Sequence, residues 1–226
     1  MWYSGGMNPD DFIITRKRKL YKFALFYNSP LCFEFDEWPR DSVVDCVEIG
    51  AGNAHFFVEQ ARRHPELQYV ALDVKADRLQ SGAAKAIEAG LTNIRFVRAR
   101  ADQVAELFTQ HSLQSIWLTF SDPFPRQRNS GRRLTHPTFL HKYAKLLKSD
   151  GRLYIKHDNP VFFNWSLEQL VGQHWLIDEL SFDLHESTLD EDYKVLTAYE
   201  ARWLGEGMVT HFARACVVRD LVIEKP

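Results

Sequence analysis

The chain has 226 residues, of which 45% are hydrophobic and 26% are charged. This balance is typical of a globular protein and excludes a disordered or collagen-like chain, while the length predicts one large domain. No apolar run approaches the roughly 18 residues that a membrane-spanning helix needs. The first residues also lack the basic and apolar regions of a secretory signal. We therefore expect a cytoplasmic protein that does not associate with a membrane.

Cysteine and histidine spacing argues against a metal site. The three cysteines lie far apart at positions 32, 46 and 216 and form no CxxC pair. This spacing fits neither a disulfide framework nor a structural zinc site. The nine histidines likewise lack the spacing of metal ligands. We expect no metal.

The charge of the chain is patterned although its net value is only −2. Residues 126–156 carry nine Lys or Arg against the single acid Asp150, whereas residues 178–200 carry eight acids against Lys194. A second basic cluster near the N-terminus interleaves with aromatic residues; it comprises Arg16, Lys17, Arg18, Lys19 and Lys22. Separate basic and acidic faces would let a nearly neutral protein bind a polyanion, because the local field decides binding. An ordinary solvated surface is the alternative.

The predicted elements alternate between strands and helices. Apolar and β-branched runs predict five strands, and helical periodicity with Gly or Pro stops predicts the helices between them. In chain order these are a strand at 43–49, a helix at 54–63, a strand at 68–73, a helix at 76–89, a strand at 94–98, a helix at 102–109, a strand at 115–120, a helix at 137–147 and a strand at 151–156. Thr135 is the expected cap of the helix at 137–147.

This alternation predicts an α/β fold with a mostly parallel sheet and helices on both faces. Residues 176–218 are more β-like and predict antiparallel strands at one edge of the sheet. Residues 1–40 fit the pattern least, so we expect a basic and aromatic N-terminal arm there and one domain over residues 41–226.

The turn after the first predicted strand is the first candidate site. In open α/β sheets, ligands bind at the carboxyl ends of the strands, where the strand order reverses. There Gly50 and Gly52 permit a sharp turn and the close approach of a ligand. A dinucleotide fingerprint would place a third glycine at position 55, which His55 occupies, so a pyrophosphate is disfavoured.

Two carboxylates complete this candidate site. Glu48 suits a cationic or amino group, and Asp73, at the tip of the second strand, can accept hydrogen bonds from both hydroxyls of a ribose. S-adenosylmethionine combines a sulfonium, an amino group and a ribose without phosphate, so we expect it as the cofactor. The plainer alternatives are a surface acid for Glu48 and a helix N-cap for Asp73.

The segment at 121–134, which reads SDPFPRQRNSGRRL, is the second candidate site. Its two prolines stiffen a loop at the carboxyl end of the sheet and would hold Asp122 rigidly above the ligand. Four arginines follow and are expected to project from this loop; they are Arg126, Arg128, Arg132 and Arg133. Guanidinium groups suit phosphates and guanine edges. Alternatively, Asp122 caps the loop and the arginines are only solvated.

This loop is accompanied by EIGAGNA at 48–54, KHDN at 156–159 and TAYE at 197–200. Together these motifs resemble the bacterial tRNA (guanine-N7)-methyltransferase family, over roughly residues 43–215. The resemblance implies a class I, Rossmann-like methyltransferase fold that depends on S-adenosylmethionine. It also implies tRNA as the partner and methyl transfer to N7 of a guanosine in the variable loop, at the site called m7G46.

The resemblance further implies roles for individual residues. Asp122 corresponds to an acid that the cofactor and the target base share, which makes it the expected catalytic residue. The positions that correspond to cofactor binding are Glu48, Gly50, Gly52, Asp73, Arg100 and Asp122. The positions that correspond to substrate binding are Arg126, Asp158, Thr197, Tyr199 and Glu200. Three residues depart from the family pattern: Arg126 replaces a Lys, Phe124 replaces a Trp, and Arg100 stands where an acid or Asn is common.

The chemistry of such a transfer needs no general base. Guanine N7 carries an unprotonated lone pair, so the rate would come from alignment of N7 with the methyl group. A carboxylate near the base could stabilise the purine cation that forms. Asp122, Asp158 and Glu200 are all candidates, and the sequence leaves the choice open. Tyr199 could stack on the flipped base.

Three other functions stay open, as does the oligomeric state. Asp122-Pro123-Phe124 resembles the D-P-P-aromatic motif of amino-methyltransferases, although the order of its residues differs. A nicotinamide-dependent reductase would use the same glycine turn, but this chain lacks the third glycine of the dinucleotide fingerprint. An RNA-binding protein without activity is the third alternative, for which Arg100 is the only indication.

Overall fold

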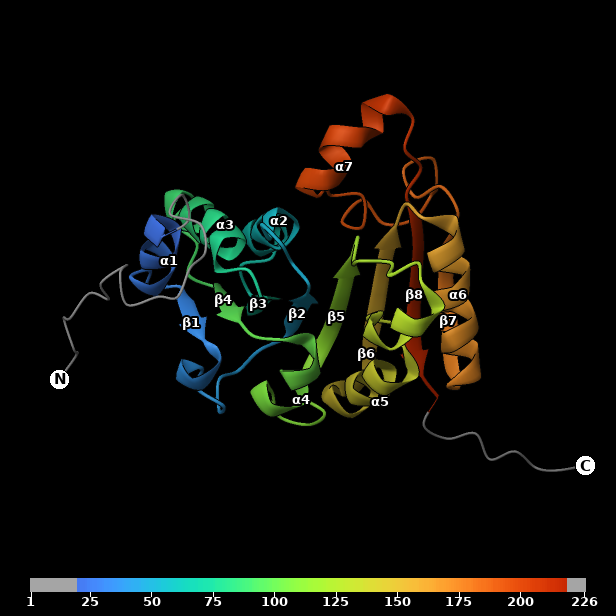
Figure 1. Ribbon diagram of the computed structural model, residues 1–226, viewed down its shortest axis with the longest axis horizontal. Coiled ribbons are helices and arrows are strands. Elements are labelled where there is room, and N and C mark those ends of the chain that lie inside the picture. The colour runs from blue at the N-terminus through green and yellow to red at the C-terminus, as the bar shows by residue number, and fades with distance from the viewer. Residues whose placement is uncertain (1–19, 219–226) are drawn as a thin grey trace, which may run out of the picture.

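The computed structural model describes residues 20–218, which form an eight-stranded sheet in the order β1-β4-β3-β2-β5-β6-β8-β7 (Figure 1). Strand β8 runs antiparallel to β6 and β7, and the other neighbouring strands are parallel. The predicted α/β fold with antiparallel strands at one edge is confirmed. The strands are β1 (Cys32–Glu34), β2 (Cys46–Ile49), β3 (Tyr69–Asp73), β4 (Ile94–Arg98), β5 (Leu113–Thr119), β6 (Leu147–His157), β7 (Trp175–Ser181) and β8 (His211–Val217).

Helices cover both faces of this sheet. One face packs against α1 (Leu20–Tyr27), α2 (His55–Arg63) and α3 (Ala76–Glu88), whose side chains share one hydrophobic cluster with that face. The other face packs against α4 (Val104–Leu107), α5 (Pro137–Leu146) and α6 (Pro160–Gly172), which share a second cluster. Each fully buried Leu or Phe in these clusters stabilises the fold by about 1.5–3 kcal/mol. The short helix α7 (Ala198–Trp203) lies beyond the ends of β5 and β6 (Figure 1).

Two helix predictions need correction. The helix expected at 102–109 is only a 3-10 turn at Ala101–Gln103 followed by α4, because Phe108 is already extended. The cap of α5 is His136, whose side chain accepts a hydrogen bond from the backbone N–H of Thr138. Thr135 is instead buried and hydrogen-bonds to Ser166 at 2.8 Å. Proline at the first helical position makes the residue directly before it the cap.

The described part of residues 1–40 belongs to the folded domain. Strand β1 pairs with β4, with Cys32 opposite Phe96. Phe26 and Trp38 are buried, and the Trp38 indole N–H donates to the Leu107 carbonyl at 3.0 Å. The domain boundary expected at residue 41 is therefore not the edge of the fold, because a three-residue strand is too short to show a period in the sequence. The basic residues at 16–19 lie outside the described residues.

The acidic segment at 178–200 does not form a face separate from the basic residues. Asp178 forms ion pairs with Arg152 at 2.8 Å and with Arg214 at 2.9 Å. Glu200 pairs with Lys156 at 2.9 Å, in the interior. The expected separation of charge is wrong for these residues, because strand pairing places acids and bases that are distant in sequence side by side.

The strand order reverses between β2 and β5. From β2 the chain continues to β3 and β4 on one side, and it returns to β5 and β6 on the other. Ligand sites form at such a point because the loops on the two sides diverge and leave a crevice. No helix within residues 20–218 has the length and apolar character needed to cross a bilayer.

Candidate active site

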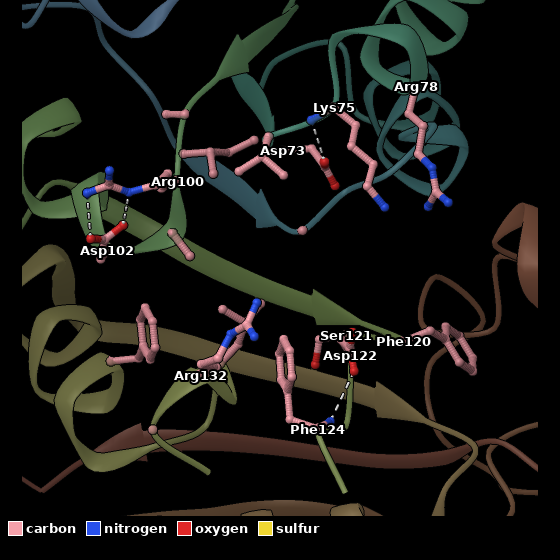
Figure 2. Close-up of a pocket in the computed structure, with 18 residues that line it drawn as sticks. Asp73, Lys75, Arg78, Arg100, Asp102, Phe120, Ser121, Asp122, Phe124 and Arg132 are labelled. Atoms are coloured by element: carbon pink, nitrogen blue, oxygen red, sulfur yellow. Dashed lines mark hydrogen bonds and ion pairs between the residues drawn. The ribbon is translucent and has the colours of Figure 1, made fainter. Parts of the chain in front are cut away.

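Two neighbouring cavities open at the carboxyl ends of β2, β3 and β5. The larger one has a volume of about 760 Å³ and is lined by Asp73, Arg100 and Asp122, among others (Figure 2). The smaller one, about 170 Å³, is lined by Glu48 and the turn at 50–54. Gly50, Arg78 and Phe120 border both cavities, so the two are parts of one hollow. It lies at the reversal of strand order, where the sequence predicts it.

Glu48 is buried at the base of the smaller cavity, with 1% of its surface exposed. The Thr119 hydroxyl of the neighbouring strand β5 donates to its Oε1 at 2.5 Å. Its Oε2 is buried and has no hydrogen-bond partner among the described residues. Burial raises the pKa of Glu48 to about 8. A buried oxygen without a donor is costly, so this carboxylate is suited to a ligand that supplies an N–H group.

Asp73 links the glycine turn to the start of α3. The backbone N–H of Gly52 donates to its Oδ2 at 2.9 Å, and that of Lys75 donates to its Oδ1 at 2.8 Å. Each carboxylate oxygen keeps a second lone pair, so a diol in the larger cavity can still donate to Asp73. Gly50 and Gly52 have φ angles of +78° and +56°, which a residue with a side chain adopts only with strain.

Asp122 lies in the loop after β5 and is exposed to the larger cavity (Figure 2). Its Oδ1 accepts a hydrogen bond from the backbone N–H of Phe124 at 3.0 Å. Phe120 and Phe124, on either side, have φ angles of +48° and +39°. A non-glycine residue in this region costs roughly 1–3 kcal/mol and persists only where its surroundings enforce it.

Arg133 provides part of that enforcement. It is buried, and its guanidinium donates to the carbonyls of Pro123 at 3.0 Å and Phe124 at 3.1 Å. The same group stacks on the Trp165 ring at 4.4 Å. The expectation that all four arginines project from the loop is wrong for Arg133, which fixes the backbone around Asp122 from below.

The other three arginines of the loop are exposed, as expected; they are Arg126, Arg128 and Arg132. Arg132 also lines the larger cavity, where its guanidinium lies 4.4 Å from the centre of the Phe124 ring. Phe124 thus keeps an aromatic face toward the cavity. These cations present a basic rim next to Asp122.

Arg100 borders the larger cavity on the side away from Phe120 (Figure 2). Its guanidinium forms two hydrogen bonds to Asp102, at 2.9 and 2.8 Å. The hydrogen bond from Arg100 holds the pKa of Asp102 below its usual value. The pair gives this wall of the cavity both a cation and an anion, so Arg100 does not bring an unbalanced charge.

Asp158 and Tyr199 meet beside the smaller cavity. The Tyr199 hydroxyl donates to Asp158 Oδ2 at 2.9 Å. Tyr199 also borders the smaller cavity, and together with Asp158, Trp203 and Glu206 it lines a third cavity of about 370 Å³. The ring of Tyr199 is exposed and can stack on a planar ligand.

Thr197 and Glu200 form the capping box of α7. The Glu200 N–H donates to the Thr197 hydroxyl at 3.0 Å, and the Thr197 N–H donates to Glu200 Oε2 at 2.8 Å. Glu200 is completely buried and also accepts from Lys156 at 2.9 Å and Thr210 at 3.2 Å. Thr197 borders the smaller cavity, whereas Glu200 does not reach the lining of the hollow. The T-x-x-E spacing itself is the sequence signal of this box.

Sequence reasoning gave no role to three residues that shape the site. Lys156 is fully buried beneath α7, and its Nζ also donates to the Val195 carbonyl at 2.9 Å. His157 joins β6 to the loop that contains Asp122, with its Nε2 at 2.8 Å from the Ser121 carbonyl. Arg78 stands where the two cavities meet. The sequence around a lysine does not show whether the lysine is buried, and Arg78 lies in no motif, so neither role was predictable.

No group of three or more His, Cys, Asp or Glu side chains that could hold a metal ion occurs within residues 20–218. The polar groups of the hollow are instead carboxylates, guanidinium groups and backbone amides. They suit an organic ligand that has both donors and charged groups.

Comparisons with known proteins identify the family of this chain. The family model described as "Putative methyltransferase" matches residues 42–213. The fold resembles that of the 16S rRNA methyltransferase KamB, with a TM-score of 0.57 at 17% identity over 79% of this chain and 90% of that chain. The chain is 36% identical over 174 residues to a tRNA (guanine-N(7)-)-methyltransferase of Brevibacillus brevis, covering 76% of this chain and 81% of the relative. A protein of the same name from Mycoplasmopsis agalactiae is 40% identical over 161 residues, covering 71% of this chain and 78% of the relative.

The residues that the family model matches include the strands and loops that build the hollow. The relatives confirm the resemblance seen in the motifs. By sequence identity and by coverage of both chains, this protein belongs to the tRNA (guanine-N(7)-)-methyltransferase family.

Proposed function

We propose that the protein transfers the methyl group of S-adenosylmethionine to N7 of a guanosine in tRNA, at position 46 of the variable loop. The relatives that share most of this chain carry the name of this activity. The observation that carries the proposal is that Glu48, Asp73 and Asp122 border one hollow at the reversal of strand order. Acting on tRNA, the enzyme works in the cytoplasm.

Glu48 and Asp73 hold the cofactor. The free Oε2 of Glu48 accepts from the amino group of the cofactor, and the second lone pairs of Asp73 accept from the ribose hydroxyls. The backbone at Gly50 and Gly52 turns sharply enough to border this ligand closely. The Arg100–Asp102 pair borders the larger cavity, which has the volume for the adenosine portion. The cofactor supplies an electrophilic methyl group on its sulfonium.

The guanine base binds between Asp122 and the pair formed by Asp158 and Tyr199. N7 has an unprotonated lone pair, so no residue has to remove a proton from that atom. The protein contributes alignment instead, and Asp122 stabilises the positive charge that develops on the purine. The Tyr199 ring stacks on the base, while the carboxylate of Asp158 accepts from the N–H groups of its edge.

The remaining predicted residues contribute at a distance or at the rim. Arg126 is exposed. It contacts a tRNA phosphate, because a guanidinium group at the rim of the site is suited to bind phosphate. Thr197 contacts the ligand where it borders the smaller cavity. Glu200, which is buried, supports substrate binding by fixing α7 and thereby Tyr199.

Methylation of unmodified tRNA with labelled S-adenosylmethionine tests this function. The labelled tRNA is treated with borohydride and aniline, which cleave the chain at N7-methylguanosine. We expect incorporation and cleavage at position 46, and neither in a tRNA with adenosine at that position. Incorporation without cleavage would favour an amino-methyltransferase. No incorporation, with tRNA still bound, would favour an RNA-binding protein without activity.

A further inference from the structure

Arg78 is a cation at the junction of the two cavities. It lies in the first turn of α3, is exposed, and borders both cavities. Its Nη1 lies 3.8 Å from the position that a Cβ would take on Gly52. Figure 2 shows its side chain extending beside that of Lys75, from the same end of α3. The guanidinium is therefore placed next to the glycine turn and within reach of a ligand there.

Two other arginines near the hollow already have carboxylate partners. Arg100 pairs with Asp102 at 2.8 Å and Arg98 pairs with Glu34 at 3.0 Å. Within residues 20–218, by contrast, no carboxylate lies within 4.0 Å of the Arg78 guanidinium. A planar guanidinium with open donors is suited to bind a carboxylate or a phosphate through two hydrogen bonds. The position of Arg78 thus points to an anionic group of a ligand.

The smaller cavity presents both an acceptor and a cation to such a ligand. Glu48 offers a buried oxygen without a donor, and Arg78 offers a guanidinium without an acceptor. The N-terminus of α2, whose cap residue is Ala54, borders the same cavity and adds partial positive charge. An α-amino acid end, with one ammonium and one carboxylate, complements this arrangement.

We propose that Arg78 binds the carboxylate of the methionine portion of S-adenosylmethionine. The proposal rests on the proposed function, because Glu48 is taken to bind the ammonium of the same ligand. It assigns Arg78 as a cofactor-binding residue outside every motif in the chain. Its role is to fix the amino acid end, so that the sulfonium between the two cavities has a defined position.

The test compares two cofactor analogues that differ at one group. Binding of S-adenosylmethionine and of decarboxylated S-adenosylmethionine is measured by calorimetry on the full chain, with wild type, Arg78→Gln and Arg78→Lys. We expect Arg78→Gln to lower the affinity for S-adenosylmethionine by about tenfold to a hundredfold, because a hydrogen bond to a charged group is lost. Decarboxylated S-adenosylmethionine should bind wild type and Arg78→Gln with equal affinity. Arg78→Lys, which keeps the charge, should recover part of the loss.

Arg62→Gln is the matched control, because Arg62 is exposed on α2, pairs with Glu59 and borders neither cavity. It should leave both affinities unchanged. If Arg78→Gln lost affinity for both compounds equally, the proposal would be overturned in favour of a structural role. Unchanged cofactor affinity with weaker tRNA binding would overturn it in favour of a phosphate contact.

His55 is the competing donor. Its Nε2 is buried without a partner among the described residues, and it borders the smaller cavity. His55→Gln could lose affinity for S-adenosylmethionine but not for the decarboxylated compound, while Arg78→Gln loses neither. That result would assign binding of the carboxylate to His55 and overturn the proposal. Wild-type binding and tRNA methylation, measured in parallel, separate these outcomes from failure of the proposed function. If wild type itself does not bind S-adenosylmethionine, the proposed function fails as well.

Discussion

Asp122 lies at the centre of the proposed site, and its side chain contributes little to the fold. It is exposed, and its Oδ1 accepts one hydrogen bond, from the Phe124 backbone. We predict that Asp122→Asn keeps this acceptor but lowers kcat by about a hundredfold or more, because the charge that stabilises the purine cation is lost. Asp122→Ala should be at least as slow.

Labelled methyl transfer measures the rates of both variants, and thermal unfolding serves as the control. Both Tm values should stay near that of wild type, because no buried contact is removed. A rate for Asp122→Asn close to that of wild type would exclude a role for the carboxylate charge.

Glu48 makes the free protein sensitive to pH. Burial raises its pKa from the ordinary 4.5 to about 8, while Lys156 opposes this rise and Asp73 and Glu200 add to it. The folded state therefore holds a proton that the unfolded chain releases above pH 4.5. The stability contributed by this proton is complete below pH 4.5 and is lost as the pH rises through 8.

We predict that Glu48→Gln, which cannot ionise, gains stability relative to wild type as the pH rises. The difference in Tm, variant minus wild type, should be more positive at pH 8 than at pH 5 in the absence of cofactor. Affinity for S-adenosylmethionine should fall in the same variant, because the amide cannot neutralise an ammonium group. A Tm difference that is constant with pH would mean that Glu48 titrates like an exposed carboxylate.

At the scale of elements, the loop after β5 contains arginines with two different tasks. Arg133 is buried under the loop and donates to two of its carbonyls, whereas Arg126 is exposed. We predict that Arg133→Gln lowers stability by about 1–3 kcal/mol, because the carbonyls of Pro123 and Phe124 lose their donor. Methyl transfer should slow too, since Asp122 loses its fixed position.

Arg126→Gln is the matched variant in the same loop. It should leave Tm unchanged, weaken tRNA binding and reduce the slope of log affinity against log salt by about one unit. Filter binding at several salt concentrations and thermal unfolding measure both effects. If Arg133→Gln changed the salt slope and Arg126→Gln did not, the two tasks would be reversed.

Helix α7 is a second element whose position depends on buried polar contacts. Its capping box is local, but the Lys156 partner of Glu200 comes from β6. Removal of one member of a buried ion pair costs more than the pair contributes, because the other charge stays buried. The position of Tyr199 above the smaller cavity is therefore coupled to the end of the central sheet.

At the scale of the whole molecule, the strands on both sides of the reversal between β2 and β5 contribute to one ligand site. A ligand that binds only the folded state at 100 times its Kd stabilises it by about 2.7 kcal/mol. For a domain of this size that corresponds to a rise in Tm of about 5–10 °C. We predict this rise with S-adenosylhomocysteine and none with NADH at the same concentration, as measured by thermal unfolding. A rise with NADH alone would favour a reductase.

The sequence by itself determined the features that depend on neighbouring residues. Periodicity and glycine stops predicted β2 to β6 with α2, α3 and α5, since these signals lie within each element. The glycine turn, the stiff loop at Asp122 and the position of Asp73 were also predictable, because the carboxyl ends of parallel strands meet at one edge. Helix α6 was not predicted, although Asn159 and Pro160 form an N-terminal signal at its start.

Only the tertiary structure decided which polar groups are buried and which are free. Arg133 and Arg132 are adjacent in sequence, yet the first is a buried support of the loop and the second lines the cavity. Glu200 is buried against Lys156, whereas Glu48 keeps an oxygen without a partner. These differences depend on contacts between strands and helices that are far apart along the chain. A side chain's neighbours in space, which set its desolvation and its partners, have no local signature in the sequence.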